Sequence, residues 1–161
     1  MSDRYPMTPQ GFKKMRDELR ECKAERPRLA EVILAARELG DLSENAEYHA
    51  AKERQGFLEG RISELETKIA QADVIDPSKV AGDRVAFGAT VGLEDVDSGK
   101  PVKYTIVGED EADAKAGRIS LHSPVARALL GHRVGDEVLV RTPGGERSLE
   151  ITELSFVALE E

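Results

Sequence analysis

Gly40-Asp41-Leu42-Ser43-Glu44-Asn45 interrupts a long helical pattern that extends from about residue 8 to about residue 72. Apolar or small residues recur with alternating three- and four-residue spacing on both sides of this stretch, as they do along the seam of a coiled coil. The seam residues are Phe12, Met15, Leu19, Cys22, Leu29, Ile33 and Ala36 before it, and Tyr48, Ala51, Leu58, Ile62, Leu65, Ile69 and Ala72 after it. A short break between two such helices predicts an antiparallel helical hairpin with Asp41 and Glu44 at its tip.

The limits of the two helices follow from capping and breaking residues. The first helix is expected to run from Thr8, a suitable N-cap, to about Leu39, and the second from residues 41–43 to about Ala72. Pro27 lies inside the first helix and predicts a bend there, because proline lacks a backbone donor and clashes with the preceding turn. At 1.5 Å per residue, two helices of this size form an arm of about 45 Å.

The composition is that of a charge-rich chain with few aromatic residues. The 161 residues are 40% hydrophobic, 34% charged and 4% aromatic, which suits a narrow helical arm better than one large core. The net charge is −8, divided as −2 over residues 1–75 and −6 over residues 76–161. Such a charge argues against a general nucleic-acid binder held by phosphate neutralisation. Any contact with nucleic acid must then be local and made by a few cations of the first half.

Cysteine usage and the N-terminal segment indicate the compartment. Cys22 is the only cysteine, so no intrachain disulfide is possible, and its place on the helical seam favours a buried thiol. The first residues show no apolar signal-peptide core, and no run approaches the ~20 apolar residues of a membrane span. We therefore expect a cytoplasmic protein that makes no contact with membranes.

The pattern changes from helical to strand-like after residue 75. We expect a hairpin domain of residues 1–75, a linker of residues 76–79 and a second domain of residues 80–161. Short stretches with strand periodicity predict strands at residues 84–87, 90–94, 102–108, 119–121, 137–141 and 149–159.

One helix is expected to interrupt these strands. Ser123 is a suitable N-cap, Pro124 suits the first helical position, and Gly131 can end the helix. The second half is thus predicted to be a small antiparallel sheet packed by one helix. The fold class is a helical hairpin followed by an α+β domain.

Two alternatives are open for the acidic residues at the tip. Asp41 and Glu44 have the spacing of a capping box, with Ser43 as an alternative cap. They could also form part of a Mg²⁺ site, because this ion prefers oxygen ligands. Two carboxylates alone bind Mg²⁺ poorly, so the second alternative requires a partner that completes the site.

Cations near the tip are likewise open to two interpretations. Arg37 precedes the tip by one turn, while Lys52 and Arg54 lie on the returning helix. They could be ordinary solvated helix charges with glutamate neighbours, or a small patch that holds a nucleic-acid backbone. The three histidines show no metal-ligand spacing, and no phosphate loop or nucleophile motif is present. Nothing in the sequence is typical of a self-contained active site.

The tip motif resembles the signature of the Gre family of bacterial transcript-cleavage factors, and most of all its GreA type. The residues that carry the resemblance are Ala36-Arg37-Glu38-Leu39-Gly40-Asp41-Leu42-Ser43-Glu44-Asn45-Ala46-Glu47-Tyr48-His49-Ala50-Ala51-Lys52-Glu53, continued by Gln55-Gly56-Phe57-Leu58-Glu59-Gly60-Arg61-Ile62. Further blocks of the second half are similar to the family, among them Ser123-Pro124-Val125-Ala126-Arg127-Ala128-Leu129-Leu130-Gly131. The resemblance covers about residues 6–157.

The resemblance implies a coiled-coil domain and an FKBP-like domain that docks on bacterial RNA polymerase near its secondary channel. The coiled coil enters that channel and stimulates the polymerase's own cleavage of backtracked RNA, so the chain is not itself an enzyme. Asp41 and Glu44 match the acids that help to hold the second Mg²⁺ and the attacking water. The ion belongs to the polymerase active centre and is not stably bound by the free protein, which we expect to be a monomer.

The resemblance also implies roles for residues outside the acidic pair. Arg37 matches a family arginine, and Lys52 stands where related factors often have arginine; both are expected to contact the 3′ part of the nascent RNA. Ser123 and Pro124 match the polymerase-binding loop, in which His122 replaces the usual Asn or Asp. Two other functions compete with this one: an inhibitory homologue that occludes the channel, and a coiled-coil chaperone.

Overall fold

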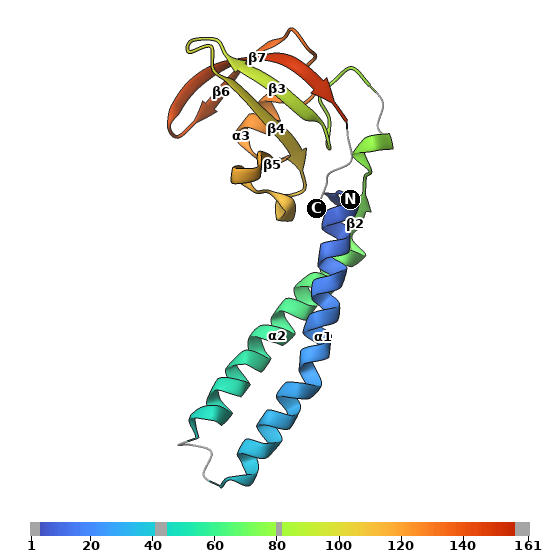
Figure 1. The fold of residues 1–161 in the computed structure, drawn as a ribbon, viewed down its shortest axis with the longest axis vertical. Helices are drawn as coiled ribbons and strands as arrows, with labels where there is room; N and C mark the ends of the chain where they lie inside the picture. The colour runs from blue at the N-terminus through green and yellow to red at the C-terminus, as the bar shows by residue number, and fades with distance from the viewer. Residues whose placement is uncertain (1–3, 41–44, 80–81, 157–161) are drawn as a thin grey trace. The chain divides into compact units, whose positions relative to one another are not determined.

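The computed structural model describes residues 4–40, 45–79 and 82–156 (Figure 1). Contacts divide the chain into two compact units. The first comprises residues 13–71, and the second joins the N-terminal residues up to 12 with residues 72 onward.

The predicted helical hairpin is confirmed. Helix α1 spans Pro9–Glu38 and continues through Pro27, and α2 spans Ala46–Ala70. Thr8 caps α1 as expected, since its Oγ1 accepts a hydrogen bond from the backbone N–H of Gly11 at 3.2 Å.

The predicted start of α2 at residues 41–43 is wrong. The N-cap of this helix is Asn45, whose Oδ1 accepts a hydrogen bond from the N–H of Tyr48 at 3.1 Å. Asparagine is among the strongest N-cap residues, and here its side chain satisfies a donor of the first turn. The helix therefore begins at Ala46.

The seam of the hairpin follows the predicted periodicity. Each seam residue is buried or half-buried, and Leu58, Ile62 and Leu65 are the most completely enclosed. Cys22 is half-buried on this seam, and its partial burial raises the pKa of the thiol. The apolar residues that recur with the helical period of 3.6 therefore form the core of the hairpin.

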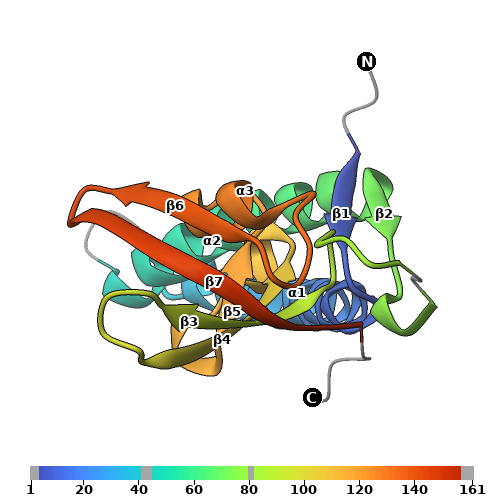
Figure 2. The same cartoon turned by 90° about the horizontal axis from the view of Figure 1, so that it is seen from above.

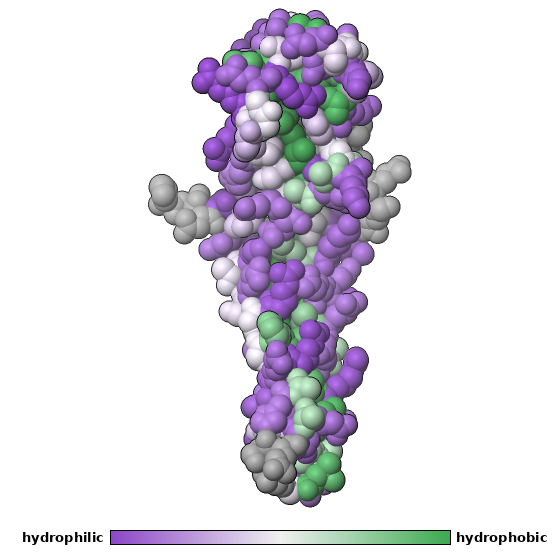
Figure 3. Space-filling view, turned by 90° about the vertical axis from the view of Figure 1, so that its left-hand side faces the viewer, coloured by the Kyte–Doolittle hydropathy of each residue, from purple (hydrophilic) through white to green (hydrophobic). Residues whose placement is uncertain are grey.

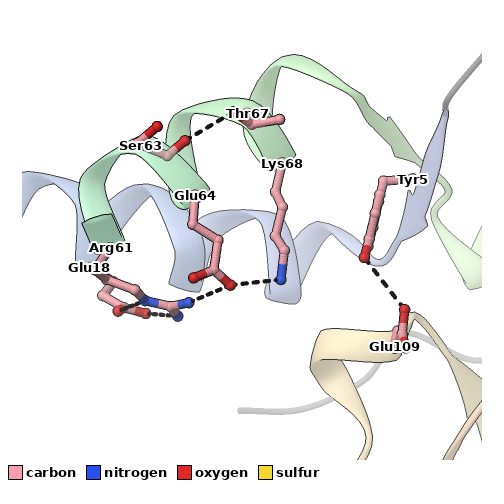
Figure 4. A network of polar contacts seen from close by, with 8 residues as sticks. All are labelled: Tyr5, Glu18, Arg61, Ser63, Glu64, Thr67, Lys68 and Glu109. Carbon is pink, nitrogen blue, oxygen red and sulfur yellow. Dashed lines mark hydrogen bonds and ion pairs between the residues drawn. The ribbon is translucent and has the colours of Figure 1, made fainter. Parts of the chain in front are cut away.

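Ion pairs between α1 and α2 flank this apolar seam. Arg61 donates two hydrogen bonds to the carboxylate of Glu18 and also contacts Glu64, which accepts a further bond from Lys68 (Figure 4). Arg26 holds Glu59 in a similar two-bonded pair, with both N–O distances at 2.7 Å. Such bidentate pairs fix the register of the two helices through geometry as well as charge.

The stability of the hairpin is expected to fall in acid because of these pairs. The hydrogen bonds from Arg61 hold the pKa of Glu18 below its usual value of 4.5, and Arg26 lowers the pKa of Glu59 in the same way. A carboxyl whose pKa is depressed by folding stabilises the fold above its unfolded pKa, and this contribution is lost as the pH falls through the folded pKa. Glu18→Gln should therefore melt at a lower temperature than the wild type at about pH 6, and the two melting temperatures should converge toward about pH 3.

Thermal melts followed by circular dichroism measure this difference. Glu31→Gln, which changes an exposed carboxylate of the same helix, is the matched control and should show little difference at either pH. A gap between wild type and Glu18→Gln that persists unchanged at the lower pH would contradict the assignment.

The second unit is built on a five-stranded sheet. Its strands have the order β5-β4-β3-β7-β6 (Figure 2). Their bounds are β3 Thr90–Asp95, β4 Pro101–Val107, β5 Arg118–Ser120, β6 Glu137–Thr142 and β7 Gly145–Ser155. Helix α3, Pro124–Leu129, is capped by Ser123 as predicted and packs against β6. The core between them includes Val91, Leu93, Ile106, Leu129 and Ile151.

The sheet is mixed, which corrects the prediction of a purely antiparallel one. Strand β5 pairs with β4 in parallel, whereas the other neighbouring pairs of this sheet are antiparallel. The segment between β4 and β5 contains two short 3-10 helices, η3 Glu109–Glu111 and η4 Ala114–Ala116, instead of a tight hairpin turn. This longer crossover returns the chain in the same direction, as a parallel pair requires.

A predicted strand at residues 84–87 is also wrong. Val85 is buried, and its backbone exchanges hydrogen bonds with the segment after α3: its N–H donates to His132 and its carbonyl accepts from Gly131, both at 2.8 Å. These two hydrogen bonds satisfy the backbone N–H and carbonyl of Val85, but they do not extend into a β-ladder. The apolar side chain of Val85 packs in the core, although residues 84–87 do not form a strand.

The N-terminal residues belong to this unit through contacts that the sequence pattern did not indicate. Strand β1, Tyr5–Met7, pairs in parallel with β2, Ala72–Val74 (Figure 2). The Glu111 carboxylate accepts hydrogen bonds from the N–H groups of Thr8 and Gly108 at 3.1 and 2.9 Å, and also from the Thr8 hydroxyl. Since Thr8 is fully buried, Glu111 satisfies donors that water cannot reach.

Candidate functional site at the end of the hairpin

Asn45 ties the two helices together where the hairpin turns. Besides capping α2, it donates a hydrogen bond from Nδ2 to the carbonyl oxygen of Ala36 at 3.2 Å. Ala36 and Ala51 are buried at this level of the seam, so the helices meet through small side chains. The predicted catalytic and metal-binding residues Asp41 and Glu44 lie outside the described residues, and Asn45 directly follows them.

Removing this link is expected to loosen the hairpin end. Asn45→Ala should lower the free energy of unfolding by about 1 kcal/mol, because the first turn of α2 loses its cap. Asn45→Asp keeps a cap acceptor and adds favourable charge at the helix N-terminus, but it loses the donor to Ala36. Urea denaturation should therefore rank the alanine variant below the aspartate variant. Equal stability of Asn45→Ala and the wild type would contradict the role of Asn45.

The two predicted RNA-binding cations lie together. Arg37 of α1 and Lys52 of α2 line one groove between the helices, with a volume of about 340 Å³. The other residues of its lining are Ala30, Ile33, Leu34 and Gln55. The Lys52 ammonium donates to the Gln55 side chain at 3.1 Å, and Arg37 forms no ion pair within the described part of the chain. Sequence spacing alone did not indicate that both cations face the same groove.

Arg54, the third cation considered from the sequence, is engaged elsewhere. Its guanidinium donates two hydrogen bonds to Glu25 of α1, at 2.7 and 2.8 Å, and these bonds lower the pKa of that carboxyl. Arg54 therefore acts as a cross-helix pair, whereas Arg37 and Lys52 remain as the cations that face the groove.

The described residues include no group of three or more His, Cys, Asp or Glu side chains arranged to hold a metal ion. The donor set at the tip has the right chemistry, since Asp41 and Glu44 offer carboxylate oxygens, which Mg²⁺ prefers. Two carboxylates leave most of a six-oxygen shell to other groups. The two carboxylates suit Mg²⁺ chemically, but an ion held by them would need further ligands from another molecule.

Comparisons with known proteins identify the family of the chain. Residues 5–74 match the family "Transcription elongation factor, N-terminal", and residues 79–156 match "Transcription elongation factor, GreA/GreB, C-term". The chain belongs to the GreA/GreB family of transcription elongation factors. The resemblance stated from the tip motif is thereby confirmed, and so is the helical hairpin followed by a sheet domain with one short helix.

Individual GreA/GreB relatives are similar over nearly the whole chain. Transcription elongation factor GreA of Anaeromyxobacter sp. (strain K) is 59% identical over 155 residues, which are 96% of this chain and 93% of the relative. Transcription elongation factor GreA of Brucella canis is 57% identical over 156 residues, covering 96% and 99%. Among solved structures, GreA factor homolog 1 of Thermus thermophilus is 27% identical, with 94% of this chain and 98% of that chain covered and a TM-score of 0.43.

The predicted docking residues of this GreA/GreB-family chain lie in the sheet unit, at the turn between β5 and α3. The Ser123 hydroxyl accepts the N–H of Ala126 at 3.2 Å, and exposed Pro124 occupies the first turn of α3. His122 is exposed, and its backbone N–H donates to the Ser120 hydroxyl at 3.1 Å. This leaves the rings of His122 and Pro124 available at the surface, while Ser123 also holds the turn.

The other two histidines have neighbours of their own among the described residues. The His49 ring lies edge-on against Tyr48 at a centroid distance of 5.6 Å, and His132 contacts Asp136 at 3.2 Å. Hydrogen bonds from the Arg133 N–H and from His132 lower the pKa of Asp136. In the described ranges, no helix combines the length and apolar character that crossing a bilayer requires.

Proposed function

We propose that this GreA/GreB-family chain binds bacterial RNA polymerase and stimulates the polymerase's intrinsic endonucleolytic cleavage of backtracked RNA, which rescues arrested complexes. The observation that supports this most is the hairpin end: the Asp41–Glu44 acidic pair is followed at once by Asn45, which joins the two helices. Arg37, four positions before Asp41 in the sequence, and Lys52 line a common groove. An acidic pair close in sequence to two cations suits a phosphodiester held next to a shared metal site.

Three parts of the chain divide this work. The hairpin domain of residues 1–75 enters the secondary channel, residues 76–79 serve as the linker, and residues 80–161 dock on the polymerase. Within the docking domain, His122, Ser123 and Pro124 contact the polymerase. Their support is the exposed turn before α3, which Ser123 holds by capping that helix.

Asp41 and Glu44 contribute carboxylate oxygens to an ion whose remaining ligands belong to the polymerase. A Mg²⁺ ion held there would supply Lewis acidity at the phosphate and would lower the pKa of a bound water. The side chains of this protein position the substrate: Arg37 and Lys52 bind backbone phosphates and orient the RNA. Lysine at position 52 offers a point charge in place of the two-pronged fork of arginine, so orientation depends more on Arg37.

This protein therefore acts as an accessory factor whose carboxylates complete the active centre of another enzyme. We propose that it works in the cytoplasm and is a monomer when free. The ion pairs between α1 and α2, such as Arg61–Glu18 and Arg26–Glu59, are consistent with a helical arm that stays folded without a partner.

A stalled, backtracked elongation complex separates this proposal from its alternatives. Addition of the purified protein should shorten the RNA from its 3′ end and restore elongation. Inhibition without shortening would favour a homologue that occludes the channel. Activity on unfolded clients in the absence of polymerase would favour a chaperone.

A further inference from the structure

The groove at the hairpin end has two unlike sides. Ala30, Ile33 and Leu34 of α1 form an apolar wall, and Lys52 and Gln55 of α2 form a polar edge, with Arg37 at the end nearer the tip. Leu34 is 59% exposed. Figure 3 shows apolar surface in patches along the hairpin, among hydrophilic surface, with some of it near the hairpin end. Leu34 therefore offers an apolar face to whatever enters the groove.

The size and chemistry of the groove suit a single nucleobase. Its volume of about 340 Å³ is close to the lower limit of small-ligand sites, ~300 Å³. Nucleobases present flat apolar faces and hydrogen-bonding edges, and proteins hold unpaired bases by contact with their faces and edges. An apolar wall opposite the Gln55 amide matches this combination, because glutamine both donates and accepts hydrogen bonds.

The cations of the groove favour a nucleotide over an apolar peptide as its occupant. Several other arginines of the hairpin are held by glutamates of the facing helix, such as Arg26 by Glu59 and Arg54 by Glu25. Arg37 forms no such pair within the described residues, and Lys52 contacts a neutral amide. An ammonium has three donors, so Lys52 can bind a phosphate while it keeps its bond to Gln55.

We propose that this groove binds one nucleotide of single-stranded RNA, base included. The base lies on Leu34 and Ile33, the Gln55 amide bonds to its edge, and Arg37 and Lys52 hold the adjoining phosphate. This inference rests on the proposed function, in which RNA reaches the hairpin end. It adds a base-binding wall and an edge-reading residue to a contact otherwise made through phosphate charge alone.

The first test needs no polymerase. The full-length protein, labelled for NMR, is titrated at millimolar concentrations with adenosine 5′-monophosphate, with ribose 5-phosphate and with inorganic phosphate. The nucleotide should shift the methyl signals of Ile33 and Leu34 and the side-chain amide of Gln55, and it should bind severalfold more tightly than ribose 5-phosphate. Equal affinity for the two sugar phosphates, with Leu34 and Gln55 unmoved, would overturn the proposal.

Variants at exposed positions then separate base contact from charge. Leu34→Ser should weaken nucleotide binding about fivefold, a value toward the lower part of the range for loss of one base contact. Val32→Ser is the matched control, because Val32 is 46% exposed on the same helix and does not line the groove. Equal losses in the two variants would refute a specific base contact.

The second test uses backtracked complexes whose extruded RNA carries either normal or abasic nucleotides. Leu34→Ser should raise the protein concentration needed for half-maximal cleavage on normal RNA but not on abasic RNA. If Leu34→Ser instead weakens binding to polymerase without RNA, the groove docks a protein segment and the proposal fails. Absence of any RNA shortening would refute the proposed function. The nucleotide titration would still show by itself whether the groove binds a nucleotide.

Discussion

Replacing Asp41 or Glu44 by alanine is expected to reduce stimulated RNA cleavage by about 100-fold or more, while affinity for the polymerase stays within about twofold. Loss of a residue that merely orients a metal ligand typically costs 10–100-fold, so loss of a ligand itself should reach at least the upper end. Binding is retained because the proposed docking residues lie in the other unit of the chain. The measurement is the rate of RNA shortening in a backtracked complex at saturating protein, with affinity determined separately by competition.

Glu47→Gln is the matched control for these variants. Glu47 lies in the first turn of α2 and is exposed, so its replacement removes one negative charge close to the tip without touching the proposed pair. Cleavage should stay within a few-fold of the wild type, because a favourable charge at a helix N-terminus contributes only about 0.3–1 kcal/mol. Full stimulation by both Asp41→Ala and Glu44→Ala would show that the tip carboxylates do not hold the ion.

Leu65→Ala is expected to lower the free energy of unfolding of the hairpin by about 2–5 kcal/mol. Its side chain is fully buried on the seam between α1 and α2, and a truncated core leucine loses its transfer free energy and leaves a cavity. Because the hairpin core is only one seam wide, few neighbours can move in to fill that space. Urea denaturation measures the loss, and amide hydrogen exchange shows where it occurs.

Leu34→Ala, at an exposed position of α1, is the control and should change stability by less than about 0.5 kcal/mol. Exchange in Leu65→Ala should speed up along α2 more than along β3 and β7, because the two units have separate cores. A uniform increase over both units would show that they unfold as one. Unchanged stability would mean that Leu65 does not belong to the core of the hairpin.

Local signals in the sequence account for much of the hairpin and for the start of α3. The spacing of seam residues predicted which faces of α1 and α2 are buried, and Ser123 with Pro124 predicted the start of α3. Asn45 was missed as the cap of α2, although its side chain is a strong capping signal, because Asp41 and Ser43 offered similar signals a few residues earlier. Competing caps of similar strength are resolved only by which side chain reaches a free donor.

The sequence by itself determined the hairpin and the strand-rich second half, because each depends on residues within a few turns of one another. Only the tertiary structure decided the parallel pairing of β5, the anchoring of Thr8 by Glu111 and the groove shared by Arg37 and Lys52. Thr8 and Glu111 are 103 positions apart, and no periodicity links such residues. Their meeting depends on how whole elements pack, where the burial of polar groups and the length of a crossover outweigh local preference.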